Sequence, residues 1–257
     1  MREKKHRSVL LSKWTKTKVL LGSSEVRPFI LDTRKFSKPN LKTMLEAYNM
    51  IYIKPEIGTY GKGVTRAERL NTGEYTYQIE TKVKTFRDFD AFHRSLLKIK
   101  GKKSYLIQKG IHLVKYNKRR FDIRVMVQLS PKGTWETTGL IGRVAQPGKI
   151  VTNYHNGGKL MDVRRLFSAH LTSTDMERVI HTLEKLGVNT AKHLHKKYPG
   201  FRQIGLDVGF DRSWTPRIIE VNTNPDPYIF NKLSDKSVYR KVMRYRAITW
   251  KKQRNRH

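Results

Sequence analysis

The amino-acid sequence predicts an α+β fold with mainly antiparallel sheets. Strand pairs joined by tight turns recur along the chain, and single helices are interspersed among them. A doubly wound parallel fold would instead place a helix between each strand and the next. Apolar residues make up 37% of the 257 residues, which is enough for a packed core.

The first half of the chain is expected to combine short strands with two helices. The predicted elements are, in order, a helix over Asn40–Tyr48, a strand over Met50–Lys54, a glycine-rich loop over Pro55–Gly63, a hairpin of Val64–Leu70 and Tyr75–Glu80, a helix over Phe86–Ile99 and a strand over Tyr105–Gln108. The helices follow from apolar residues at helical spacing, and the hairpin from the Asn71-Thr-Gly73 turn.

The second half is expected to contain two strand pairs around one long helix. These elements are strands over Phe121–Leu129 and Trp135–Val144, a helix over Thr174–Lys197, and closing strands over Gly205–Phe210 and Arg217–Asn222. Thr174 and Glu177 have the spacing of a capping box, which marks the start of the long helix.

The chain carries a large positive charge. Lys and Arg total 54 against 21 acidic residues, which gives a formal charge of +33. Such an excess favours a polyanionic partner, such as nucleic acid, an anionic cell-wall polymer or a membrane surface. A solvated basic surface without a partner explains the same composition, and both interpretations stay open.

Residues 234–257 form the most basic segment, with nine Lys or Arg residues against the single acid Asp235. Val238, Val242 and Tyr245 recur in it at helical spacing, which predicts a helix that docks by this stripe. The cations would then face solvent or anchor the protein to an anionic polymer.

Two absences limit the classes of function. The chain has no cysteine, so disulfides, thiolate metal sites and cysteine nucleophiles are excluded. No apolar run approaches the roughly 18 residues that span a bilayer, and no apolar signal region follows the basic residues Met1–Arg7. We therefore expect a cytoplasmic protein without a transmembrane segment.

The two closing strands place oxygen-bearing side chains together. Glu220 and Asn222 are two positions apart, so they share one face of a strand, and Asp207 on the preceding strand can lie opposite them. Carboxylate and amide oxygens suit Mg²⁺, which typically keeps waters and takes further oxygens from phosphates. The alternative is a solvated hairpin face with incidental acids.

Two further segments have residues suited to binding anions. In the loop after Lys54, three glycines allow backbone N–H groups to approach a phosphate, although glycine loops often only turn the chain. Asp122 and Arg124 share one face of a strand whose other face is apolar, which indicates either a surface ion pair or an anion site. Arg143 and Asn153 follow on the return segments.

Six segments follow one another along the chain: Tyr52-Ile-Lys-Pro55, Gln108-Lys-Gly-Ile111, Phe121-Asp-Ile-Arg124, Gly142-Arg-Val-Ala145, Val151-Thr-Asn153 and Glu220-Val-Asn222. In this order they resemble the ATP-grasp superfamily, and their residues are most similar to those of the YheC/YheD family of spore-coat-associated proteins. The resemblance covers most of the chain. It implies two α+β lobes that clasp ATP: a basic segment over residues 1–35, an N-terminal lobe with a glycine-rich lid over 36–108, a C-terminal lobe with the metal site over 109–233, and the basic tail.

The resemblance also implies roles for individual residues. Nucleotide binding would involve Lys13, Lys54, Gly58, Tyr60, Gly61, Gly63, Asp122 and Asn153, with Gln108, Lys109, Gly110 and Ile111 beside the adenine. Arg124 and Arg143 would stabilise a developing acyl phosphate. Asp207, Glu220 and Asn222 would bind Mg²⁺, or Mn²⁺ in its place.

The implied activity is that of an ATP-dependent carboxylate–amine ligase, which needs no protein nucleophile. The carboxylate, the amine and the oligomeric state are left open. The alternative is a non-catalytic nucleotide-binding or structural component associated with the spore coat. Two departures from the family concern the acceptor and adenine sites: only about 50 residues precede the Lys54 strand, too few for a separate leading domain, and Lys109 stands where an acidic or aromatic residue is frequent.

Overall fold

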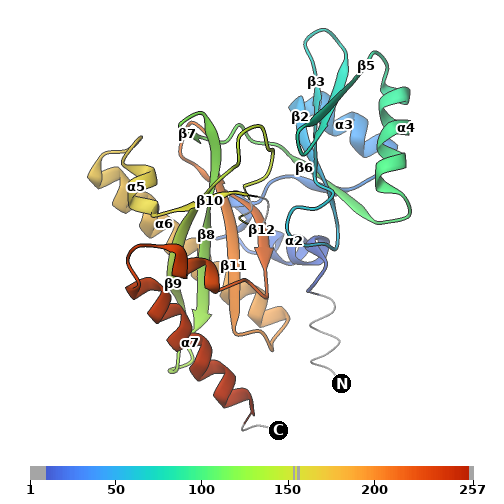
Figure 1. The fold of residues 1–257 in the computed structure, drawn as a ribbon. Helices are drawn as coiled ribbons and strands as arrows, with labels where there is room; N and C mark the ends of the chain where they lie inside the picture. Colours follow the sequence, from blue (N-terminus) through green and yellow to red (C-terminus); the bar gives the residue numbers. More distant parts are fainter. Residues whose placement is uncertain (1–9, 153, 155–156, 255–257) are drawn as a thin grey trace.

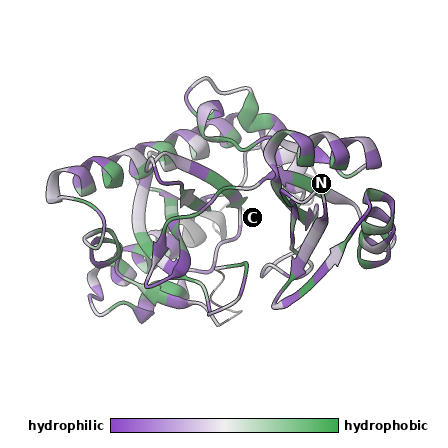
Figure 2. Ribbon diagram, turned by 90° about the horizontal axis from the view of Figure 1, so that it is seen from above, coloured by the Kyte–Doolittle hydropathy of each residue, from purple (hydrophilic) through white to green (hydrophobic). Residues whose placement is uncertain are grey.

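The chain folds into two lobes, each built around one antiparallel sheet (Figure 1). The computed structural model describes residues 10–152, 154 and 157–254. Within these ranges, no helix combines the length and the apolar character needed to cross a membrane. Seen from above, the lobes lie side by side, and each has its own apolar strands (Figure 2).

The N-terminal lobe has a six-stranded sheet in the order β1-β6-β2-β3-β4-β5. Its elements are β1 (Thr33–Lys35), α3 (Lys38–Tyr48), β2 (Met50–Pro55), β3 (Thr65–Arg69), β4 (Tyr75–Ile79), β5 (Lys82–Phe86), α4 (Phe89–Lys100) and β6 (Tyr105–Lys109). Buried residues of α3 and α4 form one apolar cluster with the strands, so both helices cover the same face of the sheet.

The C-terminal lobe has the strand order β10-β9-β8-β11-β12, with β7 paired to β8. Its elements are β7 (Lys115–Tyr116), β8 (Arg119–Leu129), β9 (Trp135–Val144), β10 (Lys159–Met161), α5 (Val163–Phe167), α6 (Ser173–Lys197), β11 (Gln203–Phe210), β12 (Pro216–Asn222), the 3₁₀ turn η3 (Tyr228–Lys232) and α7 (Ser237–Arg254). The predicted α+β class with antiparallel sheets is confirmed.

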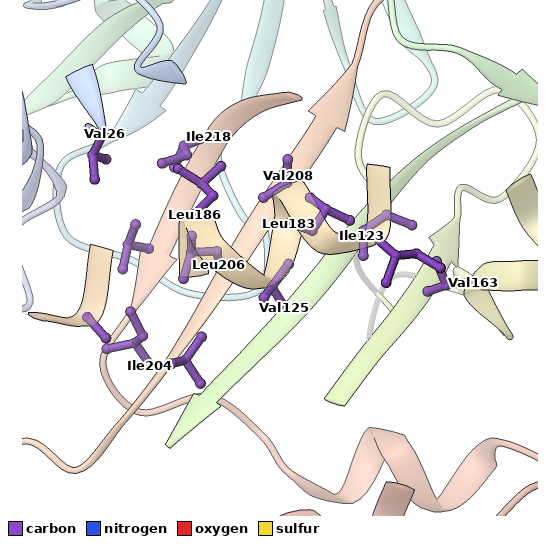
Figure 3. Packing of buried hydrophobic residues seen from close by; sticks show 14 of the residues in the cluster. Val26, Ile123, Val125, Val163, Leu183, Leu186, Ile204, Leu206, Val208 and Ile218 are labelled. Carbon is purple, nitrogen blue, oxygen red and sulfur yellow. The ribbon is translucent and has the colours of Figure 1, made fainter. Parts of the chain in front are cut away.

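Helix α6 covers one face of the C-terminal sheet. Leu183 and Leu186 pack on Val125 and Leu206, because α6 is amphipathic and these strand residues alternate toward it (Figure 3). Gly187 allows the close approach, since a Cβ at this position would lie 2.7 Å from a methyl group of Val127. This packing determines how close α6 lies to strands β8 and β11.

Helix α7 covers part of the opposite face. Val242 is fully buried and joins a second apolar cluster with Met126, Ile141 and Phe230. Tyr245 is buried as well, and its hydroxyl donates to Glu136 Oε2 at 2.6 Å. The apolar stripe predicted for the C-terminal tail therefore docks as a helix on the sheet.

The chain before β1 is folded too. Helix α2 (Lys13–Leu21) packs against α6 and β12 of the C-terminal lobe, and the turn η1 (Arg27–Phe29) leads from it to β1 in the other lobe. The sequence pattern indicated only a basic segment here. The sequence did not indicate helix α2 because the apolar stripe of this helix is weak. Leu20 is its one fully buried aliphatic side chain.

Two helix starts differ from the sequence-based expectation. Helix α6 is capped by Thr172, whose side chain accepts from Asp175 N, so the predicted box of Thr174 and Glu177 is wrong. The Thr172 hydroxyl also donates to the Asp175 carboxylate at 2.8 Å, so the side chains of the N-cap residue and of the third helical residue are bonded to each other. Helix α4 begins after the N-cap Asp88, and the predicted helical residue Phe86 instead ends strand β5.

Candidate functional site

Two adjoining cavities lie where the lobes meet. The interlobe cavity is lined from both sheets by Tyr52, Lys54, Gln108, Lys109, Ile111, Asp122, Arg143, Thr152, Asp207 and Glu220, among others. The outer cavity opens beside it and is lined by Lys16, Gly58, Tyr60, Arg124, Asn222, Asn224 and Asp226, among others. Gly61, Arg143, Asp207 and Glu220 line both cavities, so the two are continuous.

Lys54 is a buried cation at the end of β2. Its ammonium donates to Gln108 Oε1 and to the carbonyl of Ile219 in the other lobe, each at 2.9 Å. Gln108 in turn donates to Thr33 Oγ1 at 3.2 Å, which fixes its amide. Burial lowers the pKa of Lys54 from 10.5 to about 8, although Glu220 opposes the shift. Lys54 is therefore a desolvated, oriented cation between the lobes, and an anion would stabilise its charged form.

Four charged side chains form a buried network across β8, β9 and β11. Arg143 donates to both oxygens of Asp122, at 2.8 and 2.6 Å, and to Asp207 Oδ2 at 2.9 Å. Arg124 donates to Asp207 Oδ1 at 2.6 Å. The strand register explains these contacts, because Asp122 lies opposite Arg143 and Asp207 lies opposite Arg124.

The network shifts the pKa of its members. Burial alone would raise the pKa of Asp207, but the charges of Arg124 and Arg143 outweigh burial and hold it below its ordinary value. Burial likewise disfavours charge on Arg143, while Asp122 and Asp207 outweigh it and raise the pKa of the guanidinium. Both groups are thus held ionised, and both arginines are held in position by their carboxylates.

The predicted metal-binding side chains meet on adjacent strands. Asp207 lies opposite Glu220, and Asn222 lies two residues further along the same face of β12. Among the described residues no group of three His, Cys, Asp or Glu side chains could hold a metal ion, so the set offers two carboxylates and one amide. Glu220 and Asn222 line the outer cavity, whereas Asp207 already accepts from two arginines. Such oxygen donors fit Mg²⁺ with waters completing its shell.

The glycine-rich loop is tied to the start of α2. Lys13 donates from its ammonium to Gly58 O at 2.9 Å and lies 3.5 Å from Glu220 Oε1. Ser12 caps α2 and donates to Glu56 Oε1 at 2.5 Å. Gly63 has a φ of 76°, and a Cβ there would lie 2.9 Å from the Tyr105 hydroxyl, so this position requires glycine. The loop thus covers the cavities in a fixed conformation.

Of the remaining predicted residues, some line the interlobe cavity and others do not. Lys109 and Ile111 line the interlobe cavity, and the Lys109 ammonium lies 4.7 Å from the centre of the Tyr48 ring. Gly110 instead packs against Met50, where a Cβ would lie 1.9 Å from the sulfur. Asn153 is outside the described residues.

Sequence reasoning missed two polar residues of the site. Thr152 donates to Asp122 Oδ2 at 2.6 Å and lines the interlobe cavity, next to the predicted Asn153. Lys16 is buried on α2 and lines the outer cavity. Position beside a predicted residue was the only signal for Thr152, and the surrounding basic run concealed Lys16.

Comparison with known sequences gives one consistent match. A family model described as YheC/D like ATP-grasp matches residues 5–248. The endospore coat-associated protein YheD of Bacillus subtilis is 27% identical over 229 residues, which cover 86% of this chain and 49% of YheD. The endospore coat-associated protein YheC of the same organism is 21% identical over 220 residues, covering 84% of this chain and 60% of YheC. The chain thus spans about half the length of these curated relatives.

Solved structures show the same fold at low identity. The D-alanine–D-alanine ligase from Coxiella burnetii has a TM-score of 0.56 and 12% identity, covering 98% of this chain and 61% of the ligase. N5-carboxyaminoimidazole synthetase from Staphylococcus aureus, complexed with ADP, has a TM-score of 0.55 and 9% identity, covering 93% of this chain and 52% of the synthetase.

The buried network predicts an effect on stability. Asp122→Asn keeps the shape of the side chain but leaves Arg143 buried with only one carboxylate. Removing one partner of a buried ion pair costs about 3–5 kcal/mol, so we expect a loss of that order in the free energy of unfolding, measured by urea denaturation. Glu177→Gln is the control, because it breaks the exposed pair with Arg164 and should cause no measurable change. Equal effects of the two variants would show that the network does not hold the lobe together.

Proposed function

Because the chain belongs to the YheC/D-like ATP-grasp family, we propose that it binds Mg-ATP between its lobes and acts as an ATP-dependent carboxylate–amine ligase through an acyl phosphate. The observation that supports this most directly is that Lys54 lines the interlobe cavity together with Arg143 and Glu220, which also line the outer cavity. A buried cation, a fixed guanidinium and an open carboxylate are the groups that phosphoryl transfer to a carboxylate requires.

The interlobe cavity suits the nucleotide. Its apolar walls include Leu31, Ile111 and Leu113, which would contact the adenine. The N–H groups of Lys109 and Gly110 already donate to the carbonyls of Asp32 and Met50, so Ile111 N–H would be the backbone donor for the base. Lys54, with Lys13 and the loop backbone above it, would hold the phosphates.

Arg124 and Arg143 would act at the junction with the outer cavity. Their carboxylate partners hold them before any ligand arrives, so charge that develops on a transferred phosphoryl group would meet donors that need no reorganisation. Mg²⁺ would be held by Glu220 and Asn222 on β12, with Asp207 opposite Glu220 on the adjacent strand β11. The ion would neutralise phosphate charge. The outer cavity would then hold the carboxylate and the amine.

A second candidate is a nucleotide-binding protein without catalysis that belongs to the spore coat. The names of YheD and YheC as endospore coat-associated proteins favour it. If this chain resembles YheD and YheC in this respect, it would be a cytoplasmic protein that associates with the spore coat. Arg124 and Arg143 line the outer cavity, where they could meet a substrate, which is why we place the ligase first.

The basic surface is a separate feature, and we assign it to an anionic polymer of the coat or wall. Arg240, Lys241 and Arg244 are exposed on α7, while Val242 and Tyr245 are buried against the sheet. The helix therefore presents these cations outward, although Lys241 also donates to the carbonyl of Thr137 at 3.5 Å. Polyanion binding through such a face releases counterions and weakens steeply with salt.

The first functional prediction is that nucleotide binding depends on Mg²⁺ through Glu220. Calorimetric titration of wild type with ATP should show affinity that falls at least about tenfold when Mg²⁺ is removed, since metal-site residues typically change affinity by this order. Glu220→Gln keeps the shape and should lose this Mg²⁺ dependence, whereas Glu74→Gln at the distant β3–β4 turn should retain it. Equal ATP affinity of wild type with and without Mg²⁺ would refute the metal assignment.

The second prediction concerns pH. Burial lowers the pKa of Lys54 from 10.5 to about 8 in the free protein, and phosphate would bind the charged form. ATP affinity should therefore be nearly full below about pH 7 and fall by about tenfold between about pH 7 and about pH 9, as expected for a group with this pKa. Lys54→Arg stays charged across this range, so its affinity should change little. A wild-type affinity that is flat to pH 9 would contradict the role of Lys54.

The third prediction separates the basic face of α7 from the nucleotide site. Arg240→Glu with Arg244→Glu should elute from heparin at clearly lower salt and keep wild-type ATP affinity. Arg94→Glu with Lys98→Glu on the exposed face of α4 makes the same change in net charge on the other lobe. If both double variants elute alike, overall charge rather than α7 binds the polymer.

A further inference from the structure

One buried cation of the site has no hydrogen-bond or ion-pair partner among the described residues. Seven charged side chains are buried in the described part of the chain: Lys13, Lys16, Lys54, Asp122, Arg124, Arg143 and Asp207. Six of them take part in the hydrogen bonds and ion pairs given above. Lys16, which is 6% exposed, forms neither with any described residue.

This arrangement is unfavourable for folding alone. Burial of an unpaired charge costs free energy, and burial lowers the pKa of Lys16 from 10.5 to about 8. Glu220 is the acid that acts on Lys16 most strongly, but Lys13 already lies 3.5 Å from that carboxylate. A methionine of similar length would fill the same space without a charge. Packing therefore gives no reason for a lysine at this position.

The position of Lys16 indicates which cavity it serves. It stands one helical turn after Lys13, so both project from the same face of α2. Lys13 bonds the glycine-rich loop. Lys16 lines the outer cavity and also a small cavity that it shares with Lys13 and Lys54, but it does not line the interlobe cavity. The segment that follows β12, with Asn224 and Asp226, lines the same outer cavity.

We infer that Lys16 is a substrate-binding residue that pairs with a carboxylate of the acceptor molecule in the outer cavity. This rests on the proposed function, and it adds to it the residue that would recognise the negative charge of the carboxylate substrate. Lys54 and Lys13, which would donate hydrogen bonds to the phosphates, already bond Gln108 and the glycine-rich loop. Lys16 is the buried cation that remains for an anion in the outer cavity.

Three variants test the assignment. Lys16→Met removes the charge at similar length and should fold with a thermal midpoint no lower than that of wild type, because an unpaired buried charge is lost. Lys16→Arg keeps the charge. Lys18→Met is the matched control, since Lys18 is on the exposed face of the same helix.

The binding experiment uses acetate, succinate and alanine, each beside the amide that lacks the negative charge: acetamide, succinamide and alaninamide. Calorimetric titrations are run on the protein alone and on the protein saturated with Mg-ADP. Wild type, Lys16→Arg and Lys18→Met should prefer at least one carboxylate over its amide by about tenfold or more, as for a buried charge pair. Lys16→Met should lose that preference and keep wild-type affinity for ADP.

Each other result overturns the inference. No preference of wild type for any carboxylate, or an unchanged preference in Lys16→Met, shows that Lys16 does not bind the acceptor. Weaker binding of ATP with unchanged binding of ADP in Lys16→Met assigns Lys16 to the terminal phosphate instead. A clear fall in the thermal midpoint of Lys16→Met identifies a structural role. If wild type binds no nucleotide, the proposed function fails, while the titrations of the protein alone still decide the role of Lys16.

Discussion

The buried network of Asp122, Arg143, Asp207 and Arg124 sets the constraint on which the rest of the C-terminal lobe depends. On β8 the charged residues alternate with Ile123 and Val125, which face α6. A slip of one residue in the pairing of β8 would move the charges into the apolar core and the apolar residues into the cavity. A single register therefore satisfies both the core and the site, and the positions of the arginines are a consequence of how the sheet packs.

The wall contributed by α2 and β2 has the opposite electrostatic character. Lys13, Lys16 and Lys54 gather near Glu220. The charge of Lys13 contributes to the lowered pKa of Lys16, and the charges of Lys13 and Lys16 contribute to the lowered pKa of Lys54. Desolvation is the largest contribution to both shifts, so water does not relieve this cost. A bound anion would relieve it. The two walls thus differ in their charge pairing. The cations on β8 and β9 are paired with carboxylates, whereas the charge of the lysines on α2 and β2 would be balanced by a bound anion.

The sequence indicated much of this arrangement because local rules govern it. The opposition of Asp207 and Glu220 and the shared face of Asp122 and Arg124 follow from strand periodicity, and the observed registers agree. The bond between Lys54 and Gln108 joins residues 54 positions apart, which no local pattern encodes. Lys16 was not predictable for another reason, since it lies in a basic run where composition cannot tell a buried lysine from a solvated one. The capping error had a similar cause, because Thr172, Ser173 and Thr174 can all cap a helix.

The same contrast explains how a chain of charge +33 could hold the proposed anion site. Exposed cations such as Arg240 and Arg244 act together through solvent, and salt screens them within about 10 Å at 0.1 M. The buried cations are screened much less and act through fixed geometry, as the two-oxygen grip of Arg143 on Asp122 illustrates. The surface would therefore attract anions of many kinds, while the cavity would distinguish among them by the positions of a few desolvated groups. Net charge and site chemistry can then change independently, because different side chains determine them.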